Sequence, residues 1–366
     1  MSDLPRSALR ILLPACVAVA AVTVAIPGID SHMDRGLVPG SCSACHLGHG
    51  VSRSPMLAAA QSEVCLACHG TQADRDRMVS RGLLASSARP PLLGSTLSLP
   101  FVHRLDAAAM TREEPNVVTC TSCHSPHRSP ESSTAQARDA PGKRISPRNP
   151  NRFEYELCHE CHGEIAVAVP GREDIRRLAN PSSRSFHPIE SPAAERSPSV
   201  DDSLAGAEIS CSDCHGNREP GRSRGPHGSS VAHLLGDEYT VGGGNAESAR
   251  TYALCYRCHE REQVLDSAAF PEHRRHVVEI RASCSTCHNP HGSVDSRALV
   301  RFGEKLPPPG VAPSLMQDRL LFVSTSPGEG ACYLTCHGHD HAPATYGGTA
   351  SEPHPIEVAP RPFGRR

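Results

Sequence analysis

The longest apolar run of this chain lies near its N-terminus. Residues 11–26 form an apolar run that follows Arg6 and Arg10. Such a run is short for a membrane-spanning helix and is typical of an export signal. Residues 1–28 are therefore predicted to be a signal peptide, or an N-terminal anchor if they are not removed.

The rest of the chain shows little hydrophobic periodicity. Aromatic residues make up 4% of the 366 residues and Trp is absent, so the chain has few large apolar side chains with which to form packed cores. Segments rich in Pro, Ser, Gly and Arg interrupt the apolar stretches and read as surface loops; they are residues 82–100, 128–150, 191–206, 305–313 and 343–366. We predict a mostly irregular backbone with short α-helices and little β-structure, organised by something other than a protein core.

Sixteen of the 17 cysteines form pairs, and every second cysteine is followed directly by histidine. Seven pairs have the spacing Cys-x-x-Cys-His, and the last pair has one additional residue. In chain order, motifs 1 to 8 are Cys42/Cys45/His46, Cys65/Cys68/His69, Cys120/Cys123/His124, Cys158/Cys161/His162, Cys211/Cys214/His215, Cys255/Cys258/His259, Cys284/Cys287/His288 and Cys332/Cys336/His337.

Cys-x-x-Cys-His is the attachment site of a c-type haem. Two thiols one helical turn apart can reach the vinyl groups along one porphyrin edge, and the adjoining imidazole then lies beneath the iron. Zinc ribbons and disulfides need no histidine after each second cysteine. We therefore predict eight covalently bound haem c groups, with the motif histidines as proximal ligands. The haems would form the core of the protein, and the chain would wrap around them.

The motifs alternate between two types. A-type motifs (2, 4, 6 and 8) have a helical approach containing Leu or Tyr, and Gly or Glu after the histidine. B-type motifs (1, 3, 5 and 7) have a small, polar approach and a second histidine shortly downstream. This internal repeat predicts half a module at residues 29–64, two-haem modules at 65–150, 151–250 and 251–304, and another half module with a Pro/Gly-rich tail at 305–366.

The remaining histidines can supply the distal ligands. Four follow B-type motifs, mostly as Pro-His: His49, His127, His227 and His291. Four stand alone: His103, His187, His276 and His354, with His273 as the alternative to His276 and His32 as the alternative to His354. These two groups together provide one distal histidine for each of the eight irons.

A histidine three residues after a motif cannot reach the opposite face of its own porphyrin, because the linking chain is too short. It should ligate a neighbouring iron and so cross-link the repeats. Our preferred pairing gives the Pro-His residues to A-type haems and the lone histidines to B-type haems.

Motif 8 leaves two questions open. The additional residue between Cys332 and Cys336 must bulge the attachment loop, which marks either a haem of unusual geometry or a tolerated variation. Just downstream, His339 and His341 either bind a metal or supply the distal ligand of the eighth haem.

This arrangement resembles the doubled-CxxCH family of multihaem cytochromes c, related in style to cytochromes c3 and c7. The resemblance covers nearly all of residues 41–357 and rests on the pattern CxxCH…H…CxxCHxPHG. It implies an octahaem electron carrier with bis-His haems outside the cytoplasm. The chain departs from the pattern in a Gly/Arg/Pro-rich insert between His215 and His227 and in the spacing of motif 8.

Six-coordinate haems pass electrons but leave no iron position open to a substrate. We therefore expect an exported, periplasmic or extracellular electron carrier without catalytic residues. Its partners would be other redox proteins, such as a membrane quinol oxidase or an outer-surface cytochrome. Two alternatives are a multihaem reductase with one open haem, acting on a nitrogen or sulfur oxyanion, and a self-assembling subunit of a polymeric cytochrome filament.

The charge distribution limits the choice of partners. The formal net charge is −2, and no basic stretch reads as a nucleic-acid site. Contact with a membrane is expected only through residues 1–28, if these are retained.

Overall fold

The computed structural model describes residues 32–48, 56–105, 117–124, 126–127, 153–164, 172–193, 196–204, 206–302, 310–324, 326 and 328–347. Several sequence predictions lie outside these residues. They are the signal peptide at 1–28, the distal-ligand candidates His49 and His354, and the part of the Pro/Gly-rich tail beyond residue 347.

The predicted fold class is confirmed, because the described chain is mostly irregular with short helices and little sheet. The α-helices are α1 (Gln61–His69), α2 (Gln72–Ser80), α3 (Gly94–Leu97), α4 (Cys120–Cys123), α5 (Glu154–His162), α6 (Ile175–Leu178), α7 (Cys211–Cys214), α8 (Ala253–Tyr256), α9 (Arg261–Leu265) and α10 (Cys284–Cys287). The 3-10 turns are η1 (Ser41–Ala44), η4 (Asp202–Leu204) and η5 (Ala232–Leu234), and η6 (Arg275–Glu279) is a π-helical turn. No helix in the described ranges has the length and apolar character needed to cross a membrane.

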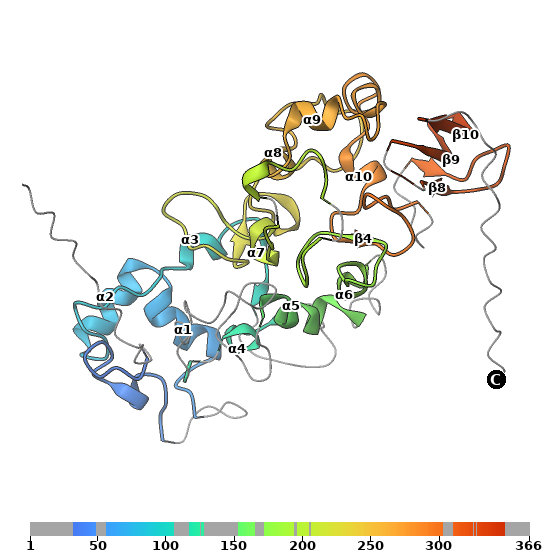
Figure 1. Cartoon of the computed structure of the whole chain (residues 1–366). Coiled ribbons are helices and arrows are strands. Elements are labelled where there is room, and N and C mark those ends of the chain that lie inside the picture. The colour runs from blue at the N-terminus through green and yellow to red at the C-terminus, as the bar shows by residue number, and fades with distance from the viewer. Residues whose placement is uncertain are drawn as a thin grey trace, which may run out of the picture.

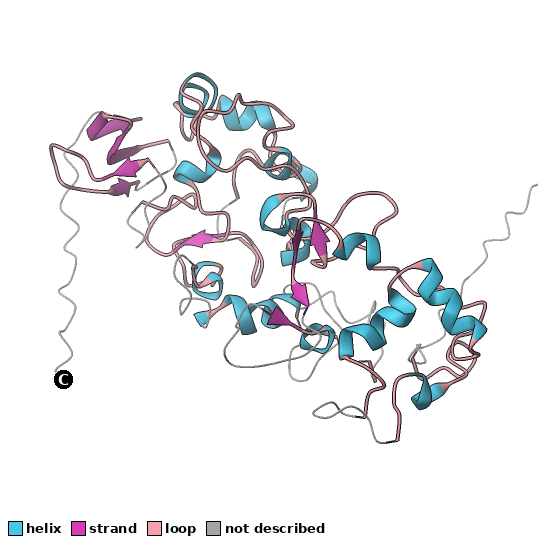
Figure 2. Cartoon of the chain, turned by 180° about the vertical axis from the view of Figure 1, so that it is seen from behind, coloured by secondary structure: helices cyan, strands magenta, loops and turns pink. Residues whose placement is uncertain are grey.

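The described chain contains three ladders of two short strands each, and strands are magenta in Figure 2. Two are antiparallel: β1 (Phe101–Val102) pairs with β5 (Gly228–Ser229), and β4 (Ser185–Phe186) pairs with β6 (Gly292–Ser293). In the third ladder, β2 (Arg104–Leu105) runs parallel to β3 (Val117–Val118). The two antiparallel ladders have the same arrangement. In each, the strand that directly precedes a lone histidine (His103 or His187) pairs with the Gly-Ser strand that directly follows a Pro-His (His227 or His291).

The largest sheet lies near the C-terminal end. It consists of β7 (Val311–Ala312), β8 (Leu321–Val323), β9 (Gly330–Cys336) and β10 (His339–Tyr346), with β9 paired to the other three strands. The predicted helical approach to motif 8 is therefore wrong, because its two cysteines lie on a β-strand.

Successive elements follow one another along the molecule (Figure 1). The N-terminal helices α1 and α2 lie at one end, and the sheet of β8, β9 and β10 lies at the other. Helices α4, α5, α7, α8 and α10, which carry motif cysteines, occupy the space between them. The haem motifs are thus spread along the long dimension of the chain.

Ten of the 17 buried apolar side chains in the described chain form three small clusters, each beside a haem motif. One contains Val300, Phe302, Val311 and Leu334; the second contains Met78, Leu84 and Ala88; the third contains Tyr252, Leu265 and Val277. Motif cysteines pack against all three: Cys287, Cys332 and Cys336 against the first, Cys68 against the second and Cys284 against the third. The protein's own core is therefore divided, and each part borders the place where a porphyrin would lie.

Candidate haem-binding site

In seven of the eight motifs the cysteines lie on a helical turn. Motif 1 is on η1, and motifs 2 to 7 are on or directly after α1, α4, α5, α7, α8 and α10. Side chains three residues apart on a helix have Cβ atoms about 5–6 Å apart on one face. This spacing lets both thiols reach one porphyrin edge.

Every motif histidine of motifs 1 to 7 faces a second histidine. The centroids of the two rings lie between 5.9 and 6.4 Å apart in each of these histidine pairs. The pairs are His46–His127, His69–His32, His124–His227, His162–His103, His215–His291, His259–His187 and His288–His273.

The ring separations fit one metal ion between two imidazoles. Metal–nitrogen bonds of about 2 Å, together with about 1 Å from each ring nitrogen to its ring centre, span about 6 Å. Groups of three or more His, Cys, Asp or Glu side chains suited to a metal ion are absent from the described chain. Zinc in a structural site takes four protein ligands, whereas a haem iron takes its equatorial ligands from the porphyrin. The residues of motifs 1 to 7 therefore fit haem c.

Hydrogen bonds orient several of these rings. A backbone carbonyl can only accept, so a ring whose Nδ1 contacts a carbonyl oxygen carries its proton there and leaves the Nε2 lone pair for a metal. The Nδ1-to-oxygen contacts are His69 to Pro91 (3.0 Å), His103 to Pro226 (2.7 Å), His187 to Pro290 (2.5 Å), His215 to His233 (2.9 Å), His227 to Arg224 (3.1 Å) and His288 to Ala298 (2.7 Å).

Burial keeps the rings in the neutral form that binds metals. Burial, and then the neighbouring His215, lower the pKa of His291 to about 3. Burial also lowers the pKa of His259 to about 4, and the hydroxyl of Ser199 lies 2.8 Å from its Nδ1. Both imidazoles are uncharged at neutral pH and are free to act as ligands.

Thiol contacts connect each A-type motif to the B-type motif that follows it. A hydrogen bond between the Cys65 and Cys120 thiols raises the pKa of Cys65 and lowers that of Cys120. The same contact recurs between Cys158 and Cys211 and between Cys255 and Cys284. It therefore joins motif 2 to motif 3, motif 4 to motif 5, and motif 6 to motif 7.

Electrostatic interactions between thiols, without a hydrogen bond, relate each B-type motif to the next A-type motif. In each case the second cysteine of the B-type motif interacts electrostatically with a thiol of the following motif. The thiol pairs are Cys45 with Cys68, Cys123 with Cys158, Cys214 with Cys258 and Cys287 with Cys332. The two sets together make every motif a neighbour of the next along the chain.

Polar side chains hold the A- and B-type helices together. The Glu154 carboxylate accepts hydrogen bonds from the backbone N–H and the hydroxyl of Ser212, at 2.6 and 2.9 Å. The Gln61 amide makes two corresponding contacts, because its Oε1 accepts from the backbone N–H of Thr121 at 3.2 Å and its Nε2 donates to the Thr121 hydroxyl at 2.8 Å. Gln61 and Glu154 both stand four residues before the first cysteine of an A-type motif. Neither residue was predicted from the sequence, although their shared offset from the first cysteine would have indicated them.

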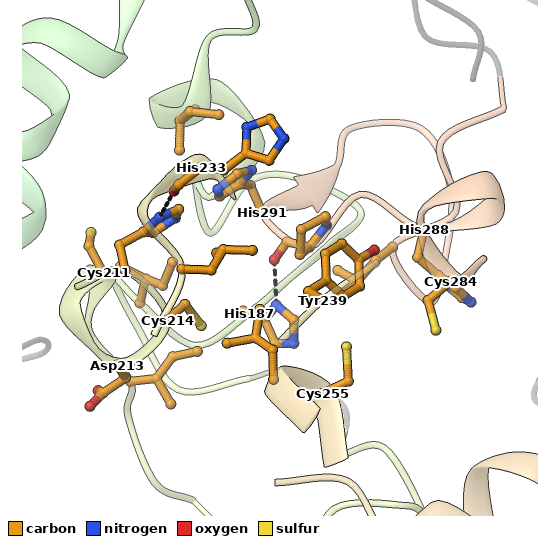
Figure 3. A pocket seen from close by; sticks show the side chains of 18 of the residues that line it. His187, Cys211, Asp213, Cys214, His233, Tyr239, Cys255, Cys284, His288 and His291 are labelled. Atoms are coloured by element: carbon orange, nitrogen blue, oxygen red, sulfur yellow. Dashed lines mark hydrogen bonds between the residues drawn. The ribbon is translucent and has the colours of Figure 1, made fainter. Parts of the chain in front are cut away.

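Motifs 2 to 8 open into one connected cavity of about 3520 Å³. A pocket for a single small ligand has about 300–1,000 Å³, so this cavity has room for several. Figure 3 shows part of it, where His187, His291 and the cysteines of motif 5 surround the same space as Cys255 and Cys284.

The histidine pairs reverse the predicted scheme. In six of the seven pairs a lone histidine faces an A-type motif, as His103 faces His162, or a Pro-His faces the preceding B-type motif, as His227 faces His124. The exception is the lone His273, which faces the B-type motif 7 as predicted. The reason for the reversal is the β1–β5 ladder, which brings His103 and His227 to adjacent ends of two paired strands. The β4–β6 ladder does the same for His187 and His291.

The alternative distal candidates also have positions in the structure. His32 faces His69 of motif 2, and His273 faces His288 of motif 7. His276 faces His341 instead, with ring centroids 6.3 Å apart. His337 of motif 8 has no ring partner among the described residues, which is a departure from the other seven motifs.

A family model, the doubled CXXCH motif, matches residues 37–74 and 204–264 of the chain. Searches of curated proteins and of solved structures found no match. The matched segments contain motifs 1, 2, 5 and 6, and Cys-x-x-Cys-His motifs indicate covalently bound haem c. Together with the histidine pairs, this similarity supports a multihaem c-type cytochrome.

Proposed function

We propose that the protein is an exported electron carrier that passes electrons along a row of bis-His haems between redox partners. The histidine pairs carry this proposal, because each one places an imidazole on both sides of a position that one iron can occupy. Haem iron, when bound, supplies the one-electron chemistry.

The protein's own residues would fix the ligands and close the irons to substrates. The Nδ1 hydrogen bonds of rings such as His103 and His187 fix their orientation. A second imidazole occupies the face that a substrate would otherwise take. This arrangement supports electron transfer over the alternative of a reductase with an open haem.

The order of the motifs supports transfer along the length of the molecule. Thiol hydrogen bonds join motifs 2 to 3, 4 to 5 and 6 to 7, and electrostatic interactions between thiols relate the other successive motifs. One end of this row lies beside α1 and α2, and the other lies at the sheet of β9 and β10 (Figure 1). Each end could therefore face a different redox partner, such as a membrane quinol oxidase and an outer-surface cytochrome.

Electron paramagnetic resonance of the oxidised holoprotein tests the proposal. We expect only low-spin signals from the irons of motifs 1 to 7, and a stepwise potentiometric titration in which every haem takes up one electron. A high-spin signal that changes on addition of nitrite or cyanide would favour the reductase instead.

A further inference from the structure

Motif 8 cannot offer both of its thiols to one porphyrin edge. Cys332 and Cys336 lie four residues apart on β9, and a strand rises about 3.3 Å per residue, which separates them by about 13 Å. In motifs 1 to 7 a helical turn brings the two cysteines to within about 5–6 Å. Pairing to both β8 and β10 holds β9 extended.

His337 is also badly placed to be a ligand. It occupies the turn between β9 and β10, where Cys336 pairs with His339. His337 has φ 48° and Gly338 has φ 80°, the combination of positive values that a two-residue hairpin turn of type I′ requires. The ring of His337 lies exposed at the tip of this hairpin.

A different pair of histidines has the geometry seen in motifs 1 to 7. The rings of His276 and His341 have centroids 6.3 Å apart. His276 donates a hydrogen bond from Nδ1 to the carbonyl oxygen of Glu272, at 2.8 Å, which leaves its Nε2 free. It lies on the π-helical turn η6, a distortion often found at functional sites.

His341 lies on the same face of the sheet as both cysteines of motif 8. It is paired with Leu334, midway between Cys332 and Cys336, and directly opposite residues on antiparallel strands point to the same face. His276 and His341 both line the cavity shared by motifs 2 to 8. A porphyrin between these two rings would therefore lie within reach of either thiol, but not of both along one edge.

We propose that the eighth haem is ligated by His276 and His341, and that at most one thioether, from Cys332 or Cys336, attaches it. His337 is then a turn residue and not a ligand. This inference rests on the proposed function, since it adds the eighth site to the same row. Cys332 interacts electrostatically with Cys287 of motif 7, which places the site next in that row.

Single attachment leaves a chemical trace. Each thioether forms when a cysteine S–H adds across one vinyl C=C, with the sulfur on one carbon and the hydrogen on the other. A porphyrin joined once therefore keeps its second vinyl group, and one cysteine keeps its thiol. The conjugated vinyl group moves the absorption of the reduced pyridine complex to longer wavelength than that of a doubly attached haem.

Alkylation of the denatured wild-type holoprotein tests the attachment without any variant. We expect mass spectrometry to find alkyl groups on one or both of Cys332 and Cys336 and on no cysteine of motifs 1 to 7. Complete protection of both cysteines of motif 8 would overturn the proposal. Alkylation in motifs 1 to 7 would instead count against the proposed function, so the two failures can be told apart.

Three single variants test the ligands in the full holoprotein. His341→Ala should produce one high-spin iron that returns to low spin when imidazole is added, whereas His337→Asn should leave all irons low-spin. Met316→Ala is the control, because the side chain of Met316 is exposed on the segment between β7 and β8 and is not among the residues that line the cavity. A high-spin signal from His337→Asn together with an unchanged spectrum of His341→Ala would refute the assignment, as would a wild-type protein with only seven irons.

Discussion

His103 donates a hydrogen bond from Nδ1 to the carbonyl oxygen of Pro226, 2.7 Å away and 123 positions later in the chain. Pro226 directly precedes His227, which faces His124, whereas His103 faces His162. The backbone beside a histidine of one pair therefore orients a histidine of another pair. His187 makes the same contact with Pro290. Each antiparallel ladder therefore positions two histidines that face successive motifs, and a change in a ladder should affect two irons.

Gly292 is the most sensitive position in the β4–β6 ladder. It has φ 151°, and a Cβ there would lie 2.0 Å from the carbonyl oxygen of Leu178. We expect Gly292→Ala to destabilise the folded protein by about 2 kcal/mol or more, because backbone would have to move. It should also weaken the low-spin signals of two irons, since His187 and His291 both flank this ladder. Thermal unfolding and electron paramagnetic resonance measure the two effects.

Gly48→Ala is the control for this substitution. A Cβ at Gly48 meets nothing within 4 Å, and its φ is not in the left-handed region. We expect wild-type stability and spectra from this variant. Equal behaviour of the two alanine variants would show that the ladder does not position the histidines.

Glu154 should hold motifs 4 and 5 together. Removing its carboxylate leaves the partly buried N–H of Ser212 without this acceptor, which costs about 1–3 kcal/mol. We therefore expect Glu154→Ala to lower the free energy of unfolding by about this amount. Glu154→Gln should be much milder, because Gln61 makes the equivalent contacts with Thr121. Chemical denaturation of the three proteins makes the comparison, and equal losses in both variants would contradict it.

The haem motifs and the irregular fold could be predicted because each depends on local sequence. Spacing alone shows that two cysteines and a histidine share a helical turn, and low aromatic content shows that the chain cannot form a large core. The distal pairing depends on contacts more than a hundred residues apart, such as that of His103 with Pro226. Local sequence does not specify such contacts, and the predicted pairing was reversed for that reason in every pair but that of His273 with His288.

At motif 8 the local sequence pattern predicted a helical approach, and the structure has a β-strand there. Its sequence looked like the other A-type motifs, and cysteines four residues apart would still share one face of a helix. Pairing with β7, β8 and β10 then holds the segment as a strand. Tertiary pairing overrides local pattern in this case, and the departure in spacing was the one available signal.

Stability should fall as the solution is acidified below pH 6.5. Burial, and then the neighbouring Arg176, lower the pKa of His159, which is not a proposed iron ligand, to about 4 from the ordinary value of 6.5. Between these values the unfolded chain binds more protons than the folded chain, so the free energy of unfolding decreases as the pH falls. Denaturant unfolding between pH 7.5 and 4.5 should therefore give steadily lower midpoints. Midpoints that stay constant or rise towards pH 4.5 would contradict this expectation.

The lone histidine and the Pro-His of one ladder should serve different irons. His103 faces His162 of motif 4, whereas His227 faces His124 of motif 3. We expect His103→Ala and His227→Ala each to give one high-spin iron, and the double variant to give two. Added imidazole should return them to low spin by filling the vacated positions. His233→Asn is the control, since this exposed histidine has φ 59°, a conformation that Asn tolerates. A double variant with only one high-spin iron would show that the two histidines share a site.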